Sequence, residues 1–320
     1  MQKRKLGNSS LEAAPFTLGG NVFGWTIDDK KSFEILDAFI AAGFNLVDTA
    51  NVYSRWVAGH TGGESETIIG SWMKQRGNRE QVIVATKAGG DMGQGKKDIS
   101  KKHILEAAED SLKRLQTDYI DLYQTHWDDN ETPVEETLSA YQQLIKEGKV
   151  RYIGASNLSP QRLVASLEAS KRDGLPKYQS FQPEYNLYAR EGFEKELEKI
   201  CMDNNLGVIN YYSLAAGFLT GKYRSEADAS KSARGEGNKK YMNERGFRIL
   251  KALDEVASKN KTTQASVAIA WLLARASVTA PIASATSLSQ LDSLIKATQL
   301  NLDAGSILLL NTASAWDGVK

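Results

Sequence analysis

Short apolar runs alternate with longer amphipathic segments along most of this 320-residue chain. The runs have the length of buried strands, and the segments between them repeat apolar residues at the three- and four-residue spacing of helices. Strands are expected at 16–20, 45–49, 82–88, 119–126, 150–155, 178–183, 207–212 and 279–283. Helices are expected at 28–42, 64–74, 100–115, 133–146, 160–170, 193–204, 245–259, 263–276 and 287–298. This alternation predicts parallel strands joined by right-handed helical crossovers.

Two α/β architectures could accommodate such a chain. Eight strand–helix units match the (β/α)8 TIM barrel, which typically takes ~250 residues plus insertions. A doubly wound open sheet would need a Gly-x-Gly-x-x-Gly sequence after an early strand, and the chain has none. We therefore predict a TIM barrel forming a single domain over 1–320, with an N-terminal hairpin and a long loop, 215–245, after the seventh strand.

The composition is that of a soluble globular protein, with 41% hydrophobic and 25% charged residues. A net charge of +1 gives no electrostatic basis for binding nucleic acid or an anionic membrane. The first residues lack the apolar segment of a signal peptide, and no apolar run is long enough to span a membrane. The lone cysteine, Cys201, cannot form an internal disulfide. We expect a cytoplasmic protein.

Four side chains capable of proton chemistry are predicted to meet at one end of this barrel. Asp48 lies at the C-terminal end of the second expected strand, Lys87 at the end of the third and His126 at the end of the fourth. Tyr53 follows five residues after Asp48, in a loop. TIM-barrel active sites lie at the C-terminal strand ends, and a buried carboxylate such as Asp48 needs a cation such as Lys87. The convergence favours a single site.

The chemistry that suits these groups is reduction of a carbonyl by hydride, with Tyr53 as the general acid. A free phenol has a pKa near ~10, too high for ready proton transfer at neutral pH. A lysine ammonium about 4 Å away contributes roughly 4 kcal/mol toward the phenolate at an effective dielectric near 20. That energy corresponds to about three pK units before desolvation opposes it. Asp48 would keep Lys87 charged, and His126 would orient the carbonyl oxygen or share the proton.

Each of the four residues alone has an ordinary structural explanation, because strand-end aspartates cap turns, lysines are solvated and single histidines are often structural.

Two further motifs give weaker evidence for a function than these four residues do. Gly90–Lys96 resembles the start of a P-loop, but Lys97 stands where Ser or Thr is needed, so we expect a flexible loop beside the site. A metal site would need a second histidine near His126, and the other two are distant in sequence, so no metal is expected.

Several segments resemble those of the aldo-keto reductase family, in order and along nearly the whole chain. Gly43-Phe-Asn-Leu-Val-Asp-Thr-Ala-Asn-Val-Tyr53 is similar to the family's signature of a glycine, Asp-Thr-Ala and a tyrosine. Ala85-Thr-Lys87 and Gln124-Thr-His-Trp127 resemble its other active-site segments. The segments that resemble its cofactor-binding regions are Gly154-Ala-Ser-Asn157, Phe181-Gln-Pro-Glu-Tyr-Asn186 and Gly217-Phe-Leu-Thr-Gly-Lys-Tyr223. The resemblance implies that Asp48, Tyr53, Lys87 and His126 form a catalytic tetrad.

The resemblance also implies where a nicotinamide cofactor binds. Ser156, Asn157 and Gln182 would hydrogen-bond the carboxamide, and Tyr211 would stack on the ring. The pyrophosphate would lie along 214–217 and Lys222, with the 215–245 segment folding over the cofactor. The full set of implied cofactor-binding residues is Asn21, Ser156, Asn157, Gln182, Tyr211, Tyr212, Leu214, Ala215, Ala216, Gly217, Lys222, Ser284, Thr286, Gln290 and Ser293.

The chain departs from the family pattern in three places. Ser54 stands where glycine is common after the tyrosine, and Tyr212-Ser213 replaces a frequent Ser-Pro pair. The segment 281–290 lacks the Lys or Arg that many relatives use on a 2′-phosphate, which leaves hydroxyls such as those of Ser284 and Thr286. Hydroxyls bind phosphate with less charge than arginine supplies. NADP is the expected cofactor, with NAD as the open alternative.

Aromatic residues near the expected strand ends suggest a substrate pocket. Trp25, Trp56 and Trp127, with Phe23 close by, would exclude water and hold the apolar or planar face of a small carbonyl compound. Packing beneath loops is the alternative role for each of these aromatic residues.

Two other functions stay open for the protein. One is a cofactor-binding regulatory or interaction subunit with weak turnover, and the other is an NAD(P)-dependent dehydrogenase of sugars or secondary alcohols. No oligomeric state follows from the sequence.

Overall fold

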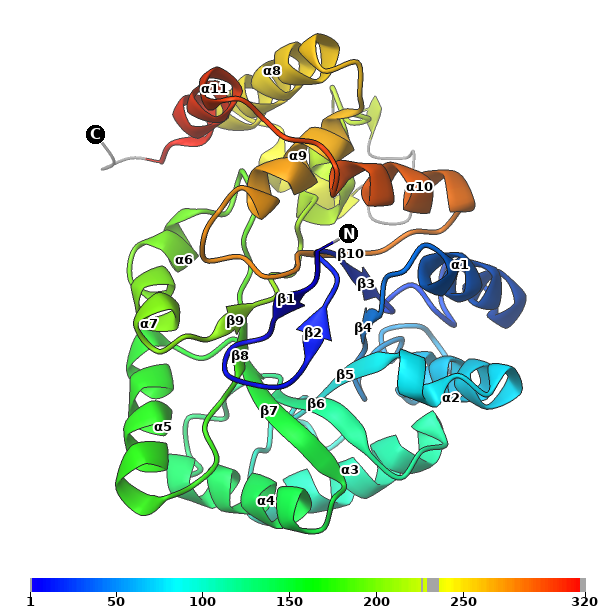
Figure 1. Ribbon diagram of the computed structural model, residues 1–320, viewed down its shortest axis with the longest axis vertical. Coiled ribbons are helices and arrows are strands. Elements are labelled where there is room, and N and C mark those ends of the chain that lie inside the picture. The colour runs from blue at the N-terminus through cyan, green and yellow to red at the C-terminus, as the bar shows by residue number, and fades with distance from the viewer. Residues whose placement is uncertain (1, 226, 229–235, 317–320) are drawn as a thin grey trace.

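A computed structural model describes residues 2–225, 227–228 and 236–316, and within them eight parallel strands form a barrel surrounded by helices (Figure 1). The strands are β3 (Thr17–Gly19), β4 (Leu46–Asp48), β5 (Ile83–Ala88), β6 (Ile120–Thr125), β7 (Val150–Ser156), β8 (Ser180–Gln182), β9 (Gly207–Val208) and β10 (Ile282–Ala283). Their order is β10-β3-β4-β5-β6-β7-β8-β9. The N–H of Thr279 donates to Val208 O (2.8 Å) and that of Ile282 to Asn210 O (2.9 Å), which joins the two ends of the sheet. The predicted (β/α)8 TIM-barrel fold is confirmed.

Helices follow the strands in the predicted alternation. They are α1 (Asp29–Ala41), α2 (Glu64–Arg76), α3 (Lys101–Leu115), α4 (Val134–Lys146), α5 (Pro160–Asp173), α6 (Glu191–Glu194), α7 (Leu197–Asp203), α8 (Glu244–Lys259), α9 (Gln264–Leu273), α10 (Leu288–Ala297) and α11 (Ala304–Ser314). Short 3-10 helices are η1 (Arg79–Gln81), η2 (Ala215–Thr220) and η4 (Glu236–Tyr241). The Ser100 hydroxyl caps α3 as predicted by accepting from the His103 N–H, which satisfies one of the free amides of the first turn.

The C-terminal half departs from the predicted elements. The helix expected at 193–204 is two helices, α6 and α7, and the break follows Glu194, whose carboxylate is held by Arg190 and Tyr185. The strand expected at 207–212 is only β9, although Tyr211 still forms a parallel bridge with Glu184 before the backbone turns left-handed at Tyr212 with φ 54°. The strand expected at 279–283 is only β10, and Pro281 before it has no N–H to donate.

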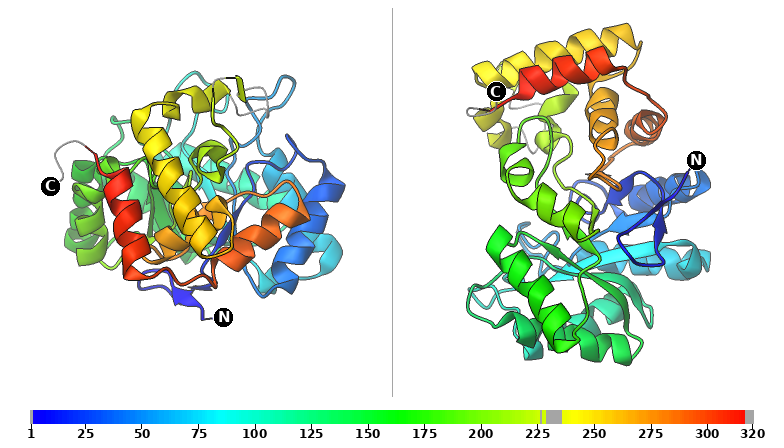
Figure 2. Two further views of the ribbon diagram at one scale, coloured as in Figure 1. Left: turned by 90° about the horizontal axis from the view of Figure 1, so that it is seen from above. Right: turned by 60° about the vertical axis from the view of Figure 1, so that its left-hand side comes forward.

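One helix was not predicted. α11 lies beyond the eighth strand–helix unit and packs beside α8, away from the barrel strands (Figures 1 and 2). Its C-terminal carbonyls are capped by arginine side chains, with Arg245 donating to Ser314 O (2.7 Å) and Arg248 to Ala313 O (3.0 Å). A cation at the C-terminal end of a helix is electrostatically favourable. The last helix is therefore fixed to α8 by apolar packing and by these charged caps.

The N-terminal end of the barrel is closed by the predicted hairpin of β1 (Arg4–Lys5) and β2 (Glu12–Ala13). Its apolar side chains join a buried cluster inside the barrel, which comprises Leu6, Leu11, Ala13, Leu46, Ala85, Leu122, Ile209, Ala280 and Ile282.

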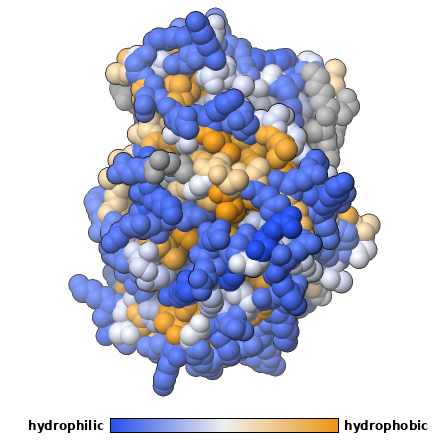
Figure 3. Space-filling model, turned by 45° about the vertical axis from the view of Figure 1, so that its right-hand side comes forward, coloured by the Kyte–Doolittle hydropathy of each residue, from blue (hydrophilic) through white to orange (hydrophobic). Residues whose placement is uncertain are grey.

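On the outside of the molecule, the face in Figure 3 is mostly hydrophilic, with apolar side chains gathered in a band across it. In the described part of the chain, no helix combines the length and apolar character needed to cross a membrane.

Candidate active site

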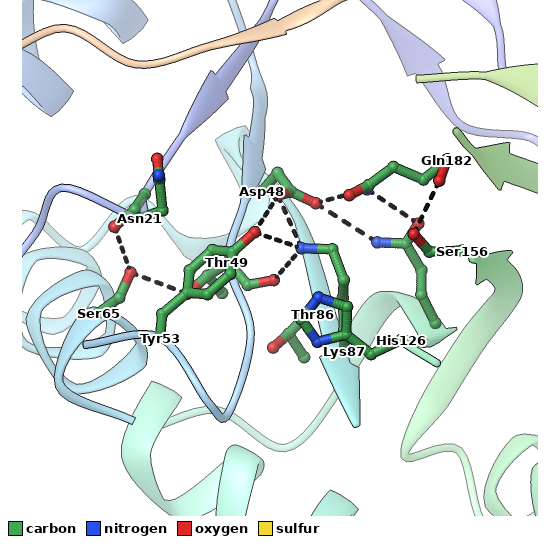
Figure 4. Close-up of polar contacts among 12 residues, drawn as sticks. Asn21, Asp48, Thr49, Tyr53, Ser65, Thr86, Lys87, His126, Ser156 and Gln182 are labelled. Atoms are coloured by element: carbon green, nitrogen blue, oxygen red, sulfur yellow. Dashed lines mark hydrogen bonds and ion pairs between the residues drawn. The ribbon is translucent and has the colours of Figure 1, made fainter. Parts of the chain in front are cut away.

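Lys87 is the centre of a buried hydrogen-bond cluster at the C-terminal end of the barrel (Figure 4). Its Nζ donates to Asp48 Oδ2 (2.8 Å), Thr49 O (2.7 Å) and the Tyr53 hydroxyl (2.9 Å). These three bonds use all three ammonium protons. The Tyr53 hydroxyl in turn donates to Asp48 Oδ2 at 3.2 Å. Three of the predicted catalytic residues therefore share one network.

Asp48, on β4, is anchored by two glutamines from other strands, Gln124 on β6 and Gln182 on β8. Gln182 Nε2 donates to Asp48 Oδ1 at 2.9 Å, and Gln124 Nε2 lies 3.5 Å from the same oxygen. Asp48 is 1% exposed and Lys87 is 0% exposed. A buried carboxylate and ammonium are tolerated only when both are paired and hydrogen-bonded, and here both conditions are met.

The pKa of Tyr53 is shifted in the direction opposite to the one expected from the sequence. Burial, and then the Asp48 carboxylate, raise the pKa of Tyr53 well above that of a free phenol. We had expected the Lys87 ammonium to lower this pKa, but desolvation and Asp48 dominate. Burial also lowers the pKa of Lys87, although Asp48 opposes that shift. Tyr53 is therefore a protonated phenol at neutral pH and can act as a proton donor.

His126 follows β6 and is held as a neutral imidazole. Burial, followed by the positive charges of Lys87 and Lys97, lowers the pKa of His126 well below its usual value. Its ring stacks on Trp127 with 3.5 Å between ring centroids. Its Nδ1 is buried and has no hydrogen-bond partner within the described residues. A neutral imidazole retains one N–H that can donate to a carbonyl oxygen.

A proton donor, a neutral imidazole and a buried ion pair at the C-terminal strand ends agree with the comparisons with known proteins. The model of the aldo/keto reductase family matches residues 15–314. The chain belongs to the aldo/keto reductase family. Members of this family are NAD(P)H-dependent oxidoreductases, and this chain is one of them.

Relatives match the chain over nearly its full length. An uncharacterized oxidoreductase, YrpG, of Bacillus subtilis is 36% identical, with 97% of this chain and 95% of the relative covered. The aldo-keto reductase YhdN of the same species is 32% identical over 98% of this chain and 93% of its own length. A probable voltage-gated potassium channel subunit beta of Arabidopsis thaliana is 34% identical over 93% of this chain and 91% of its own length.

The residues that aldo/keto reductases would use on the nicotinamide form a chain of hydrogen bonds. The Tyr211 hydroxyl donates to Asn157 Oδ1 (2.8 Å), and Asn157 Nδ2 donates to Ser156 Oγ (3.0 Å) and His126 O (2.9 Å). Ser156 Oγ donates to the backbone oxygen of Gln182 at 2.7 Å. These four residues therefore lie together, and the Gln182 side chain joins them to Asp48.

The segment expected along the pyrophosphate has unusual backbone geometry. Ala215, Ala216 and Gly217 have φ values of 46°, 53° and 95°. Left-handed alanines are strained by about 1–3 kcal/mol each and are found mainly at functional sites. A Cβ on Gly217 would lie 3.5 Å from Lys222 Cε, which places the Lys222 side chain beside the same turn. The strained turn and a lysine beside it suit a bound phosphate.

The residues expected near the 2′-phosphate separate into three groups. Ser284 Oγ hydrogen-bonds Asn21 Oδ1, while the Thr286 N–H and hydroxyl donate to Gln290 Oε1 at 2.9 and 3.1 Å. These contacts gather polar groups around the start of α10. Ser293 is turned instead toward α9, where its hydroxyl lies 3.1 Å from Thr263 Oγ1. Its orientation gives no support to a phosphate contact.

Of the four residues predicted to line an aromatic pocket, the three tryptophans lie near Tyr53 and His126. Trp25 and Trp56 meet edge to face with 5.4 Å between centroids, and Trp56 contacts Tyr53 in the same way at 6.1 Å. Trp127 covers His126. Phe23 is 0% exposed and belongs to the hydrophobic core, so it has no surface to offer a substrate. Its burial therefore gives no support to a contact between Phe23 and a substrate, and its backbone oxygen accepts from the Ser54 hydroxyl at 3.0 Å.

Gln124 was assigned no role from the sequence, and Ser54 was noted only as a departure from the family pattern. Gln124 precedes His126 by two residues on β6, so the two-residue period of a strand could have placed it on the inner face with Lys87. Ser54 has φ 71°, the conformation that glycine adopts most easily. This backbone explains why glycine is common at that position in relatives.

Proposed function

We propose that this aldo/keto reductase reduces aldehydes or ketones to alcohols with NADPH, using Tyr53 as the general acid. The observation that carries the proposal is the Lys87 Nζ at 2.9 Å from the Tyr53 hydroxyl and 2.8 Å from Asp48. An ammonium in this position stabilises the phenolate that forms when Tyr53 gives up its proton. Asp48 keeps that ammonium charged in a buried setting.

The reacting groups have separate roles. The neutral His126 donates a hydrogen bond to the substrate carbonyl oxygen and fixes its orientation. Tyr53 donates its proton to that oxygen as negative charge develops there. Ser156, Asn157, Gln182 and Tyr211 would hold the reduced nicotinamide, which would supply a hydride to the carbonyl carbon. Lys87 stabilises the Tyr53 phenolate until a proton is recovered from solvent.

The preference for NADPH rests on neutral groups. Ser284, Thr286 and Gln290 offer hydroxyl and amide groups for a 2′-phosphate, and Asp292 is the charged residue in the segment 284–293. Each charge-assisted hydrogen bond contributes roughly 1.5–3 kcal/mol. We therefore propose that NADPH binds more tightly than NADH, by a smaller factor than an arginine would give.

Steady-state turnover tests the proposal directly. Purified protein is mixed with NADPH and a simple aldehyde, and NADPH oxidation and alcohol formation are measured together. Equal rates of both are expected at neutral pH, with slower turnover when NADH replaces NADPH. Binding of NADPH without alcohol formation from any of a panel of aldehydes and ketones would reject the proposal.

A second candidate is a regulatory subunit that binds the cofactor and turns over slowly. It is favoured by the 34% identity to a protein named as a probable voltage-gated potassium channel subunit beta, a match that covers 93% of this chain. The hydrogen bonds around Lys87 suit either role. Turnover numbers separate the two candidates, because a reductase reaches the usual range of about 1–1000 per second, whereas a regulatory subunit would remain far below it.

A further inference from the structure

Arg55 lies at the edge of the active site and has no ion-pair partner among the described residues. It follows Tyr53 by two residues and precedes Trp56, and its side chain is partly buried. Its Nε is buried without a hydrogen-bond partner. Within the described part of the chain, no carboxylate lies at ion-pair distance from its guanidinium. A partly dehydrated guanidinium with free donors is ready to bind an anion.

The segment 89–98 places this guanidinium on the rim of the site. A Cβ on Gly93 would lie 3.0 Å from Arg55 Nη2, so the guanidinium rests against Gly93. A Cβ on Gly90 would lie 2.8 Å from Trp127 Cζ3 and 3.6 Å from Val52 Cβ. The same glycine-rich segment therefore contacts Arg55 at one point and the ring that stacks on His126 at another.

The Asp91 carboxylate, which lies near enough to Arg55 to feel its charge, accepts hydrogen bonds from backbone donors. Asp91 Oδ1 accepts from the N–H groups of Gly93 (2.8 Å) and Gly95 (3.0 Å). These bonds, and then the charge of Arg55, lower the pKa of Asp91, although the two residues form no ion pair. Glu64 Oε1 accepts from the N–H of Thr61 at 3.0 Å, while its Oε2 is buried without a hydrogen-bond partner among the described residues. Neither Asp91 nor Glu64 pairs with Arg55, so the guanidinium has no carboxylate partner in the part of the chain that the structure describes.

Two lysines on the same segment add positive charge. Lys96 and Lys97 are exposed and form no ion pair with the described residues. Lys97 is near enough to His126 for its charge to act on the imidazole, after burial and Lys87. Apart from Asn21, which follows β3, the residues expected to bind the cofactor lie on β7, β8 and the segments that follow β9 and β10, whereas Arg55 follows β4. A cofactor phosphate is therefore not the anion that Arg55 serves.

We propose that Arg55 binds an anionic group, a carboxylate or a phosphate, carried by the substrate at the end remote from its carbonyl. The proposal rests on the reductase function above and adds a substrate class to it. The planar guanidinium binds either group through paired N–H donors. Trp56 follows Arg55 directly and meets Trp25 edge to face, so these two rings contact the apolar part of the substrate between the carbonyl and the anion.

Matched aldehydes test this specificity. The readout is the ratio of kcat/KM for 4-carboxybenzaldehyde to that for 4-methylbenzaldehyde, and a second pair compares glyceraldehyde 3-phosphate with glyceraldehyde. We expect the wild type to favour one or both anionic members by about 10- to 100-fold, the range of a charge-assisted contact. The pair with the larger ratio identifies a carboxylate or a phosphate as the preferred group.

Variants assign the preference to Arg55. Arg55→Met is expected to bring the ratio close to one, mainly through KM for the anionic aldehyde, and Arg55→Lys to retain part of it. Arg76→Met is the matched control, since Arg76 lies at the C-terminal end of α2 and pairs there with Asp37. It removes the same charge at the opposite end of the barrel and should keep the wild-type ratio. Raising the ionic strength should lower the wild-type ratio.

The outcomes separate the two proposals. Reduction of neutral aldehydes without preference for either anionic partner would overturn the Arg55 inference and leave the reductase function intact. A preference that survives in Arg55→Met, or is lost equally in Arg76→Met, would also overturn it. No reduction of any aldehyde would overturn both. If Arg55→Met fails to fold, inhibition of the wild type and Arg55→Lys by 4-methylbenzoate is compared, with weaker inhibition of the variant expected.

Discussion

The two ends of the barrel interior are built from the same strands but have opposite chemistry. At the end formed by the N-terminal ends of the strands, Leu46, Ala85 and Leu122 pack with the N-terminal hairpin in an apolar cluster. Two residues further along each strand the inner face carries Asp48, Lys87 and Gln124. The two-residue period of a strand therefore converts three core positions into three site positions over about 7 Å.

The difference shows how the barrel divides stability from function. Burial of an apolar side chain stabilises the fold by roughly 1.5–3 kcal/mol. A buried ion pair adds little net stability, because desolvation offsets the attraction between its charges. The pair of Asp48 and Lys87 at the polar end therefore serves the chemistry of the site, whereas the side chains at the apolar end stabilise the packing of the strands. Substitutions at the two ends should consequently change different quantities.

The largest effect is expected from Tyr53→Phe at the polar end. The variant removes only the hydroxyl, so kcat for aldehyde reduction should fall by roughly 100- to 10,000-fold, the contribution of a positioned general acid. NADPH affinity, measured by fluorescence titration, and the unfolding free energy should stay close to those of the wild type. Near-normal turnover would show that Tyr53 is not the acid.

Lys87→Met should damage both function and stability. It leaves Asp48 as an unpaired buried carboxylate, which costs about 3–5 kcal/mol when one partner of a buried pair is removed. Chemical denaturation of Lys87→Met measures this loss, and the double variant Asp48→Asn/Lys87→Met should recover much of the stability without recovering turnover. Lys113→Met, at an exposed position on α3, is the control for loss of a lysine. A double variant as unstable as the single one would contradict the argument.

Leu122→Ala at the apolar end should reduce stability alone. Leu122 is fully buried, and truncation of a buried leucine typically costs roughly 2–5 kcal/mol. The KM for aldehyde and kcat per folded molecule, measured well below the melting temperature, should match those of the wild type. A fall in kcat comparable to that of Lys87→Met would show that the two ends are not independent.

The fold was predictable from the sequence because the alternation of strands and helices survives in every barrel unit. Convergence of Asp48, Lys87 and His126 followed from topology, since the C-terminal ends of parallel strands meet at one end of a barrel. α11 was missed because it packs on α8 outside this repeat, and nothing in the repeat requires a further helix. The aldo/keto reductase resemblance supplied the cofactor residues, which no periodicity would have found.

Other features depended on the three-dimensional environment. Ala215 and Ala216 adopt a left-handed backbone that an alanine in a sequence does not indicate, whereas a glycine would have suggested it. The direction of the Tyr53 pKa shift depends on burial and on the position of Asp48, neither of which a spacing defines. Phe23 and Trp25 are only two residues apart, yet one is buried in the core and the other lies beside Trp56. Burial of single side chains in loops is set by tertiary packing.

The smallest effect concerns His126 and the acid stability of the polar end. Burial lowers the pKa of His126 in the folded protein, so the unfolded chain takes up a proton near pH ~6.5 while the folded protein does not. The stability that this histidine contributes is thus present above that pH and is lost progressively as the pH falls toward the folded-state pKa. Between pH 7.5 and 5.5 the loss should approach about 1.4 kcal/mol, the effect of one proton bound only by the unfolded state over that window.

Urea denaturation of the wild type and of His126→Gln at both pH values measures this loss of unfolding free energy. The wild type is expected to lose more stability than the variant by that amount. The same loss in His126→Gln would place the acid sensitivity elsewhere in the molecule, and a wild type that gains stability at pH 5.5 would mean that His126 is protonated in the folded protein.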